Sequence, residues 1–550
     1  MTVNTPRRTP LRALFLLLAL SLLVAACGGG GDSGGSDSAT GGGDDANVPE
    51  GEPVAGGKLV IGLEADSDGF DPTKNRWAVS GHSVALAIFD PLMMRNADGE
   101  VVPYLAESLE PNDDHTVWTL KLREGVQFHD GTALDSAAVK QNIDAHLASA
   151  LTGPALAQVA SVEATDPLTV TITMDGPWVP FPAYLSGQLG YVAAPSMLND
   201  PEGSRRPVGT GPFVFEEWIP GQRLRATKNA DYWRADEGLP YLDEVEFRPI
   251  LEAQSRLSAV QSGEVDVFHT TDANTISALR GTDLQAIEID EGATEESFVL
   301  LNTARPPFDN RNARLALAHA TDRERYVNVM GPDVLELANG PFSGQDEYPE
   351  PDFPAYDIEE AKRFVAAYEE ETGEKLTFAY ATTNNAVSLQ GAQLLQDMWK
   401  EAGIDVQIDQ VEQSALISNA IVGDFQAHGW RQHGEEDPDQ AFVWWDVNNA
   451  NDLGTLSLNF GRYKNEELQQ ILTEARANPD EEARREAYGE VAQIFADDVP
   501  FLYLARTLWA YGAKTDVGGL TGGTPMPDGA GETGQPTAGV FRPADLYRTR

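Results

Sequence analysis

A short polar segment in the second half of the chain combines side-chain types that commonly bind small molecules. Residues 428–439 read His-Gly-Trp-Arg-Gln-His-Gly-Glu-Glu-Asp-Pro-Asp, and Phe425 and Phe442 flank them. Binding clefts combine apolar or aromatic walls with a few polar groups aimed at the ligand. The segment therefore predicts a contact surface for a solute, with Trp430 as part of its wall. A tryptophan beside glycine in a polar loop also caps protein cores, so both roles for Trp430 stay open.

Two further interpretations of the same segment compete with solute binding. His428, His433 and Glu435 admit a metal site, because imidazole and carboxylate ligands suit nickel or zinc. Nothing in their spacing fixes a ligand geometry, so we expect neither a metal nor a cofactor. Asp437 stands directly before Pro438, and an Asp-Pro pair begins ordinary turns without any ligand. A turn explains Asp437 as well as binding does.

One serine motif suggests a catalytic nucleophile. Gly81-His82-Ser83-Val84-Ala85 has the spacing of a nucleophile elbow, in which serine lies on a tight turn between a strand and a helix. The preceding residues 74–80 are too polar for the buried strand that an elbow requires, and the residues from Val84 onward continue as a helix face. We therefore expect no enzyme. A secreted serine hydrolase with Ser83 as its nucleophile is the alternative from another functional class.

Charge and cysteine count exclude several classes of partner. The 550 residues include 39 Lys and Arg against 86 Asp and Glu, a formal charge of -47. Such a surface repels a phosphate backbone, so we expect no nucleic acid partner. The only cysteine is Cys27, which excludes an intrachain disulfide and a zinc site built on paired cysteines. Cys27 therefore needs an explanation of its own.

The start of the chain supplies that explanation. Residues 1–26 carry three arginines and no acid, and their apolar run is short for a bilayer span, which is typical of a secretory signal peptide. The run ends in Leu-Val-Ala-Ala-Cys-Gly, which resembles the lipobox of bacterial lipoproteins and predicts a diacylglycerol on Cys27. Residues 27–57 are rich in Gly, Ser, Asp and Ala and predict a disordered tether. An uncleaved membrane anchor and either the general or the twin-arginine export route stay open.

Hydrophobic periodicity predicts a mixed α/β chain. Alternating residues indicate strands at 117–122 and 169–174. Alternation at 376–380 and 404–408 flanks a helical repeat at 394–402, which together form a βαβ unit. Such a unit requires two parallel strands joined by a crossover helix.

Three local signals predict turns, caps and loops. In His129-Asp130-Gly131 we expect a structural turn with Gly131 in a left-handed conformation. Asp357 is placed to cap the following helix while Glu360 reaches back to it. Residues 516–539 are rich in Gly, Pro and Thr and predict a long surface loop before a short terminal element.

A series of short motifs runs in order along the chain. The most distinctive is Leu-Arg-Glu-Gly-Val-Gln-Phe-His-Asp-Gly-Thr-Ala-Leu at 122–134. The others are Phe70-Asp71-Pro72, Gly209-Thr210-Gly211-Pro212-Phe213, Asn229-Ala230-Asp231-Tyr232-Trp233, Gly263-Glu264-Val265-Asp266, Pro307-Phe308-Asp309, the stretch 313–323 and Asp497-Asp498-Val499-Pro500. Together they resemble the extracellular solute-binding proteins of ABC importers, in the family that binds peptides, nickel and related solutes.

The resemblance implies an α/β, two-lobed periplasmic-binding-protein-like fold with a hinge. The first lobe would comprise residues 58–300 plus 501–550, with an inserted subdomain at about 96–205. The second lobe would comprise residues 301–500. The predicted βαβ unit falls in this second lobe, where the family has one.

The resemblance also implies where solute contacts lie. The family places ligand contacts in residues 428–439, where peptide binders hold the terminal ammonium with a carboxylate, by position Glu435 or Glu436. This chain has an extra residue before Asp437, so His433 or Gly434 falls near the expected acid and the choice of solute stays open. If Trp444 and Trp445 lie on a strand, they point to opposite sides of it, so at most one would face solute. The candidate ligand-binding residues are Trp77, Trp178, Trp430, His433, Glu435, Glu436, Asp437 and Trp445.

These observations predict a lipid-anchored, non-enzymatic receptor on the extracytoplasmic face of a bacterial cell membrane. We expect it to capture an oligopeptide or similar polar solute by hinge closure and to deliver it to an ABC permease and its ATPase. We expect a monomer. Besides the serine hydrolase, the alternatives are a binding protein for a nickel chelate, a sugar or a signalling solute.

Overall fold

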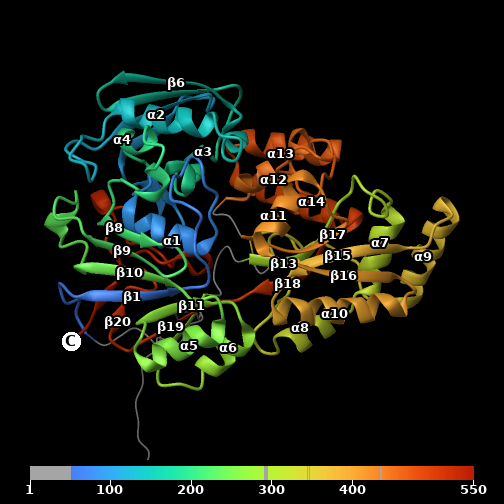
Figure 1. The fold of residues 1–550 in the computed structure, drawn as a ribbon. Coiled ribbons are helices and arrows are strands. Elements are labelled where there is room, and N and C mark those ends of the chain that lie inside the picture. The colour runs from blue at the N-terminus through green and yellow to red at the C-terminus, as the bar shows by residue number, and fades with distance from the viewer. Residues whose placement is uncertain (1–50, 290–294, 344, 346, 434–436) are drawn as a thin grey trace, which may run out of the picture. The chain divides into compact units, whose positions relative to one another are not determined.

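The computed structural model arranges the strands of the described residues in two large mixed sheets and three smaller sheets (Figure 1). The structure describes residues 51–289, 295–343, 345, 347–433 and 437–550. The predicted signal peptide, Cys27 and most of the predicted tether lie outside them. Val54 and Gly56 donate backbone hydrogen bonds to Arg548 and Tyr241 at 2.8 and 2.7 Å. The folded part therefore begins before the boundary expected at Lys58.

The first large sheet contains strands from both ends of the chain, in the order β12-β19-β11-β1-β10-β9-β8. The central strand β1 pairs in parallel with β10 and β11, and the remaining pairs are antiparallel. Its strands are β1 (Lys58–Leu63), β8 (Phe213–Ile219), β9 (Arg223–Lys228), β10 (Glu244–Pro249), β11 (Val267–Thr270), β12 (Gln285–Ile289) and β19 (Trp509–Ala513). The associated helices are α1 (Val79–Ile88), α5 (Ala253–Ser262) and α6 (Ala273–Leu279).

A four-stranded antiparallel sheet, β4-β5-β7-β6, lies within the stretch expected as an insertion. Two of its strands match the predicted bounds at 117–122 and 169–174. Gly131 has φ 81°, which confirms the predicted turn. The elements between residues 93 and 198 are β2 (Met93–Arg95), β3 (Val101–Pro103), β4 (Ala106–Pro111), β5 (Val117–Leu122), β6 (Val159–Asp166), β7 (Thr169–Met174), α2 (Ser136–Leu147), α3 (Phe181–Tyr184) and α4 (Pro195–Leu198).

The second large sheet has the order β14-β18-β13-β17-β15-β16. Its strands are β13 (Glu295–Leu301), β14 (Glu336–Leu337), β15 (Thr377–Thr383), β16 (Asp405–Val411), β17 (Ala427–His433) and β18 (Phe501–Thr507). Both β13 and β18 pair with strands of this second sheet. The next strand along the chain, β19, belongs to the first sheet. The lobe borders expected at residues 300 and 501 therefore move to the ends of β12 and β18, because backbone pairing, not the motifs, assigns these strands.

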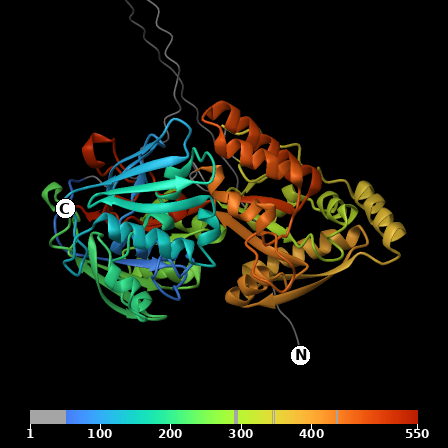
Figure 2. The ribbon, with the colours of Figure 1, turned by 90° about the horizontal axis from the view of Figure 1, so that it is seen from above.

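The predicted βαβ unit is confirmed: β15 and β16 run in parallel on either side of α10 (Ala386–Glu401) in the chain. The ring of Trp399 is fully buried against Phe378 and Tyr380, and its Nε1 donates to Thr321 Oγ1 at 2.8 Å. Figure 2 shows two other helices of this half, α13 and α14, side by side. The helices are α7 (Arg311–Ala320), α8 (Arg323–Met330), α9 (Ile358–Thr372), α11 (Gln413–Val422), α12 (Phe442–Trp445), α13 (Glu466–Ala477) and α14 (Glu481–Asp498).

Two local predictions need adjustment. Asp357 caps α9 by accepting from the backbone of Glu359 and Glu360 at 3.0 Å, as predicted, but the carboxylate of Glu360 pairs with Arg363. The stretch 516–539 is mainly loop, yet parts of it pack into the protein. Thr533 is buried and donates to the buried carboxylate of Asp545 at 3.0 Å. The terminal elements are β20 (Val517–Gly518) and β21 (Tyr547–Arg548).

No helix among the described residues has both the length and the apolar character needed to cross a bilayer.

Candidate functional site

A buried polar cluster centred on Asp439 joins the stretch expected as an inserted subdomain to the part of the chain that contains the second large sheet. Asp439 is fully buried in the short 3-10 helix η5 (Pro438–Ala441). Nε of Arg476, on α13, donates to both carboxylate oxygens at 2.9 and 3.0 Å. From the inserted subdomain, Trp178 Nε1 and the Tyr184 hydroxyl donate to Oδ2 at 2.9 and 3.0 Å. One carboxylate therefore receives hydrogen bonds from both parts of the chain.

The cluster satisfies its buried charges internally. The Arg476 guanidinium lies 3.6 Å from the centre of the Phe442 ring and 4.8 Å from that of Trp178, a cation–π arrangement. Burial, with the charge of Asp439, holds the pKa of the Tyr184 hydroxyl well above its usual value, so this phenol remains a donor. Removing one partner would leave another charge buried and unpaired, which is strongly destabilising.

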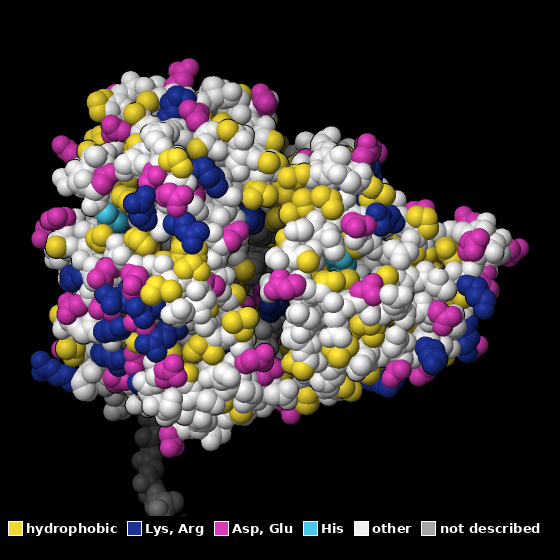
Figure 3. All heavy atoms as spheres, viewed as in Figure 1, with side chains coloured by type: hydrophobic (Ala, Val, Ile, Leu, Met, Phe, Trp, Pro, Cys, Tyr) yellow, Lys and Arg dark blue, Asp and Glu magenta, His cyan; other side chains and the backbone are white. Residues whose placement is uncertain are grey.

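Further contacts cross between the two lobes. Arg431, on β17, donates to Thr271 Oγ1 at 3.1 Å and pairs with Glu295 at 3.2 Å. The Arg76 guanidinium lies 5.0 Å from the centre of the Trp444 ring. Figure 3 shows a narrow groove down the face of the molecule, with hydrophobic side chains gathered beside its upper end. The lobes therefore meet through several polar contacts and enclose a groove.

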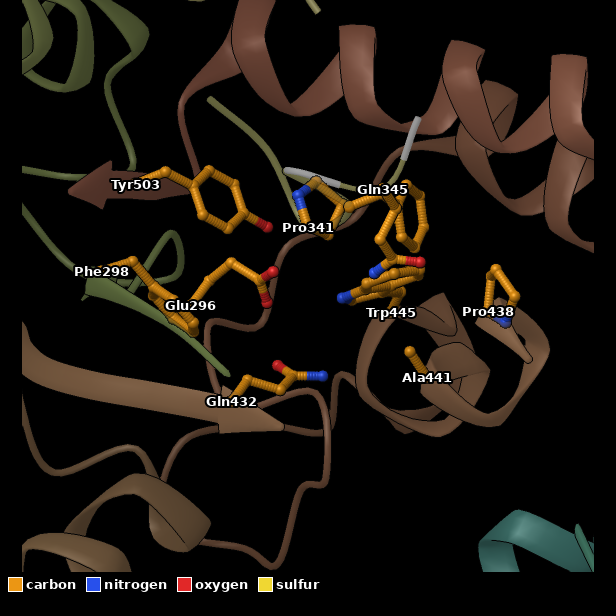
Figure 4. A pocket seen from close by; sticks show the side chains of 10 residues that line it. Glu296, Phe298, Pro341, Gln345, Gln432, Pro438, Ala441, Trp445 and Tyr503 are labelled. Atoms are coloured by element: carbon orange, nitrogen blue, oxygen red, sulfur yellow. The ribbon is translucent and has the colours of Figure 1, made fainter. Parts of the chain in front are cut away.

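A pocket lies against the second sheet, on one face of β13 (Figure 4). The residues that matter for its chemistry are Glu296, Phe298, Phe342, Gln432, Trp445 and Tyr503. Glu296 is 3% exposed, and its Oε1 has no hydrogen-bond partner among the described residues. Burial is the main cause that raises the pKa of this carboxyl well above its usual value. The pocket thus combines aromatic walls with one unsatisfied acid.

The structure moves two of the predicted cleft tryptophans into protein contacts. Trp77 is 6% exposed and donates from Nε1 to the Gly69 carbonyl at 2.8 Å, inside the first lobe's core. Trp178 has no exposed surface, and its ring nitrogen Nε1 donates a hydrogen bond to Asp439. Both rings pack in this structure and offer no free wall to a solute, because their neighbours in the fold already cover them.

The tryptophans of the second lobe have different positions. Trp430 is half-buried on β17, with its ring 5.3 Å from that of Phe460, and remains a candidate contact. Trp444 and Trp445 lie in the helix α12, so the alternation that a strand would impose does not apply to them. Trp445 is the one that lines the pocket, where it packs against Phe342.

Among the acidic candidates, Asp437 has the structural role. It forms a capping box with Gln440 at the start of η5 and accepts hydrogen bonds from Arg484 at 2.6 and 2.7 Å. The turn interpretation is confirmed, and its carboxylate is occupied. Glu435 and Glu436 lie outside the described residues, as does the side chain of His433, which ends β17.

Of the residues named for the metal and hydrolase alternatives, the structure describes the side chains of His428 and Ser83. His428 is 1% exposed with its ring 4.1 Å from that of Phe425, and burial lowers its pKa to about 3. No group of three or more potential ligands gathers for a metal within the described part of the chain. Ser83 lies within α1, where it donates to the Val79 carbonyl at 2.9 Å and accepts from Phe541. It is therefore not on a strand–turn–helix elbow.

Sequence reasoning missed Glu296, Arg476 and Tyr184. A signal for Glu296 was present, because two adjacent acids begin an otherwise apolar strand and alternation places them on opposite faces. Arg476 and Tyr184 carry no comparable local signal, since their partner Asp439 is distant in the sequence from Tyr184 and on another element from Arg476.

Comparison with known proteins identifies the family. Residues 100–454 match the model for bacterial extracellular solute-binding proteins, family 5 Middle. The glutathione-binding protein GsiB of Pectobacterium atrosepticum is 25% identical over 489 residues, covering 85% of this chain and 92% of its own length. Di/tripeptide-binding protein 2 of Pseudomonas aeruginosa is 27% identical over 506 residues, covering 84% and 92%.

Solved structures share the fold. The ABC transporter-associated periplasmic binding protein DppA from Helicobacter pylori, in complex with peptide STSA, has a TM-score of 0.78 and 24% identity, covering 90% of this chain and 99% of its own. The two-lobed periplasmic-binding-protein fold is therefore confirmed. With a family match over more than half its length, this chain belongs to the bacterial extracellular solute-binding proteins of family 5.

Proposed function

We propose that this protein is the lipid-anchored receptor of an ABC importer, which captures a peptide or similar polar solute between its lobes and delivers it to a membrane permease. The observation that carries the proposal is the set of contacts around Asp439, through which the two lobes meet. The names of the glutathione-binding and di/tripeptide-binding relatives favour a peptide-like solute.

Hinge closure gives the binding mechanism. The chain crosses between the two sheets from β12 to β13 and returns from β18 to β19. Contacts that exist only when the lobes meet, such as those of Arg431 with Thr271 and of Trp178 with Asp439, stabilise the closed state. A solute bound between the lobes shifts the population further toward closure, because it contacts both lobes only in that state.

Solute binding is tested by a thermal-shift screen of the purified full-length protein against peptide pools, sugars, polyamines and chelated nickel. We expect the peptide pools to raise the melting temperature, because a ligand at about a hundred times its dissociation constant adds roughly 2.7 kcal/mol of stability. A response to a sugar or nickel chelate alone would replace the peptide with that solute class. No response to any pool would contradict the proposed capture of such solutes.

The Asp439 cluster predicts a large effect of Arg476→Met. The change keeps much of the side-chain volume but leaves the Asp439 carboxylate buried without its cation, so we expect the free energy of unfolding to fall by about 3–5 kcal/mol. Urea denaturation measures it. The matched control is Arg485→Met, which removes an exposed arginine paired with Glu481 on α14 and should change stability by less than about 1 kcal/mol. Equal effects of the two substitutions would contradict the central role of Asp439.

The lipid anchor is tested through Cys27. In Cys27→Ala the acceptor of the lipid is absent, so we expect the protein to move from the membrane fraction to the soluble fraction after cell lysis and ultracentrifugation. If the Cys27→Ala protein sediments with membranes to the same extent as the unchanged protein, then something other than a lipid on Cys27 attaches the protein to the membrane.

A further inference from the structure

The pocket on the second sheet holds a buried acid that the fold does not satisfy. Glu296 stands on β13 directly between Gln432 of β17 and Arg506 of β18. Nη1 of Arg506 donates to Glu336 Oε2 at 3.0 Å, on the outer strand β14. Glu296 Oε1 has no hydrogen-bond partner among the described residues, although Glu296 is 3% exposed. Leaving a buried polar atom unpaired costs free energy. A bound ligand that supplies the missing partner would remove this cost.

The remaining walls of the pocket favour a positive charge. Phe298, Phe342, Trp445 and Tyr503 supply aromatic rings, whose faces attract cations. Among the described residues that line the pocket, Glu296 is the only carboxylic acid, and none of them is Lys, Arg or His. Figure 4 shows the Glu296 carboxyl and the Gln432 amide pointing toward the space beside Trp445. A carboxylate, an amide oxygen and aromatic faces together form a receptor for a cation.

We propose that this pocket receives a cationic group of the captured solute, an ammonium or an amidinium, with Glu296 as its counter-ion. The inference rests on the proposed function and specifies the chemistry of the solute. The cavity volume is about 30 Å³, which exceeds the space one water needs but is far below that of a whole peptide. The pocket therefore holds a head group, and the rest of the solute lies outside it.

The position of Glu296 gives this chain an acid beside the segment where sequence analysis expected one. Glu296 pairs in register with Gln432, which precedes His433 in the segment 428–439. The two described acids at the other end of that segment, Asp437 and Asp439, are already paired with Arg484 and Arg476. The counter-ion that we propose lies on the neighbouring strand β13.

Cation binding at this site also moves a proton. Desolvation raises the pKa of Glu296, the nearby charges of Glu295 and Glu350 raise it further, and Arg506 opposes them. The hydroxyl of Tyr503 also has a raised pKa, through burial and the charge of Glu296, and stays protonated. An incoming cation favours the ionised carboxylate, so binding converts the carboxylic acid to carboxylate and releases its proton to solvent.

The test uses isothermal titration calorimetry to measure how three peptide probes bind to the full-length protein. Two of the probes carry one positive charge, and one is uncharged. The probes are tri-alanine amide with a free amino terminus, its N-acetylated form, and N-acetyl-Ala-Lys-Ala amide. The first and third carry one cation and the second carries none. Titrations in buffers of different ionisation enthalpy report proton release.

We expect a cationic probe to bind the unchanged protein at least tenfold more tightly than the neutral probe, with release of a fraction of a proton. Glu296→Gln should abolish both the preference and the release, because its amide has a similar shape and no charge. The control Glu288→Gln, which alters an acid on β12 paired with Arg280, should preserve both.

Two outcomes separate this inference from the proposed function. Equal binding of charged and neutral probes, or a preference that survives in Glu296→Gln, would overturn the cation site while leaving solute capture intact. Failure of every probe to bind, together with silence of the peptide pools in the thermal-shift screen, would overturn both.

Discussion

A charged carboxylate inside a protein must be paired, and the way Asp439 meets this requirement organises the contact between the lobes. Its partners come from two separate parts of the chain: Arg476 from the second lobe, and Trp178 and Tyr184 from the inserted subdomain. The exclusion of water from such a cluster strengthens each of its hydrogen bonds. The loss of any one partner leaves a buried polar group unpaired, which costs free energy. The cluster therefore favours an all-or-none contact, which suits a protein that opens and closes.

The second lobe contains another buried carboxylate, and the contrast between the two is informative. Asp439 is saturated by donors, whereas Glu296 keeps an unpaired oxygen facing a pocket. A saturated acid needs no further partner, while an unsatisfied acid gains one when a ligand supplies the missing charge. In this account the Asp439 cluster holds the lobes together, and Glu296 selects the solute.

Local patterns predicted the elements of the fold well. The βαβ unit around α10, the strands β5 and β7 and the turn at Gly131 depend on alternation, helical spacing or glycine, all of which are local. The lobe borders were less accurate, because β13 and β18 join the second sheet through pairing between residues about 200 positions apart. The burial of Trp178 was also beyond local reasoning, since its partner Asp439 is distant in sequence.

The candidate site was predicted only in outline. Two residues of the segment 428–439, Gln432 and Pro438, line the pocket. Trp445, which follows this segment in the sequence, also lines it. Asp437 proved to be a cap, as its Asp-Pro sequence allowed. Glu296 was not predicted, because an acid at the start of a strand is ordinarily solvated, and its burial depends on packing by residues that are distant in sequence.

The most direct test of this account is the distance between the lobes in solution. Spin labels at Ser258 on α5 and Glu370 on α9, in a background lacking Cys27, would allow double electron–electron resonance to measure it. The account predicts a single narrow distance in the otherwise unchanged protein with its solute. It predicts a longer and broader distribution when Arg476→Met removes the cation from Asp439. The same narrow distribution in both proteins would contradict the claim that the buried Asp439 cluster holds the lobes together.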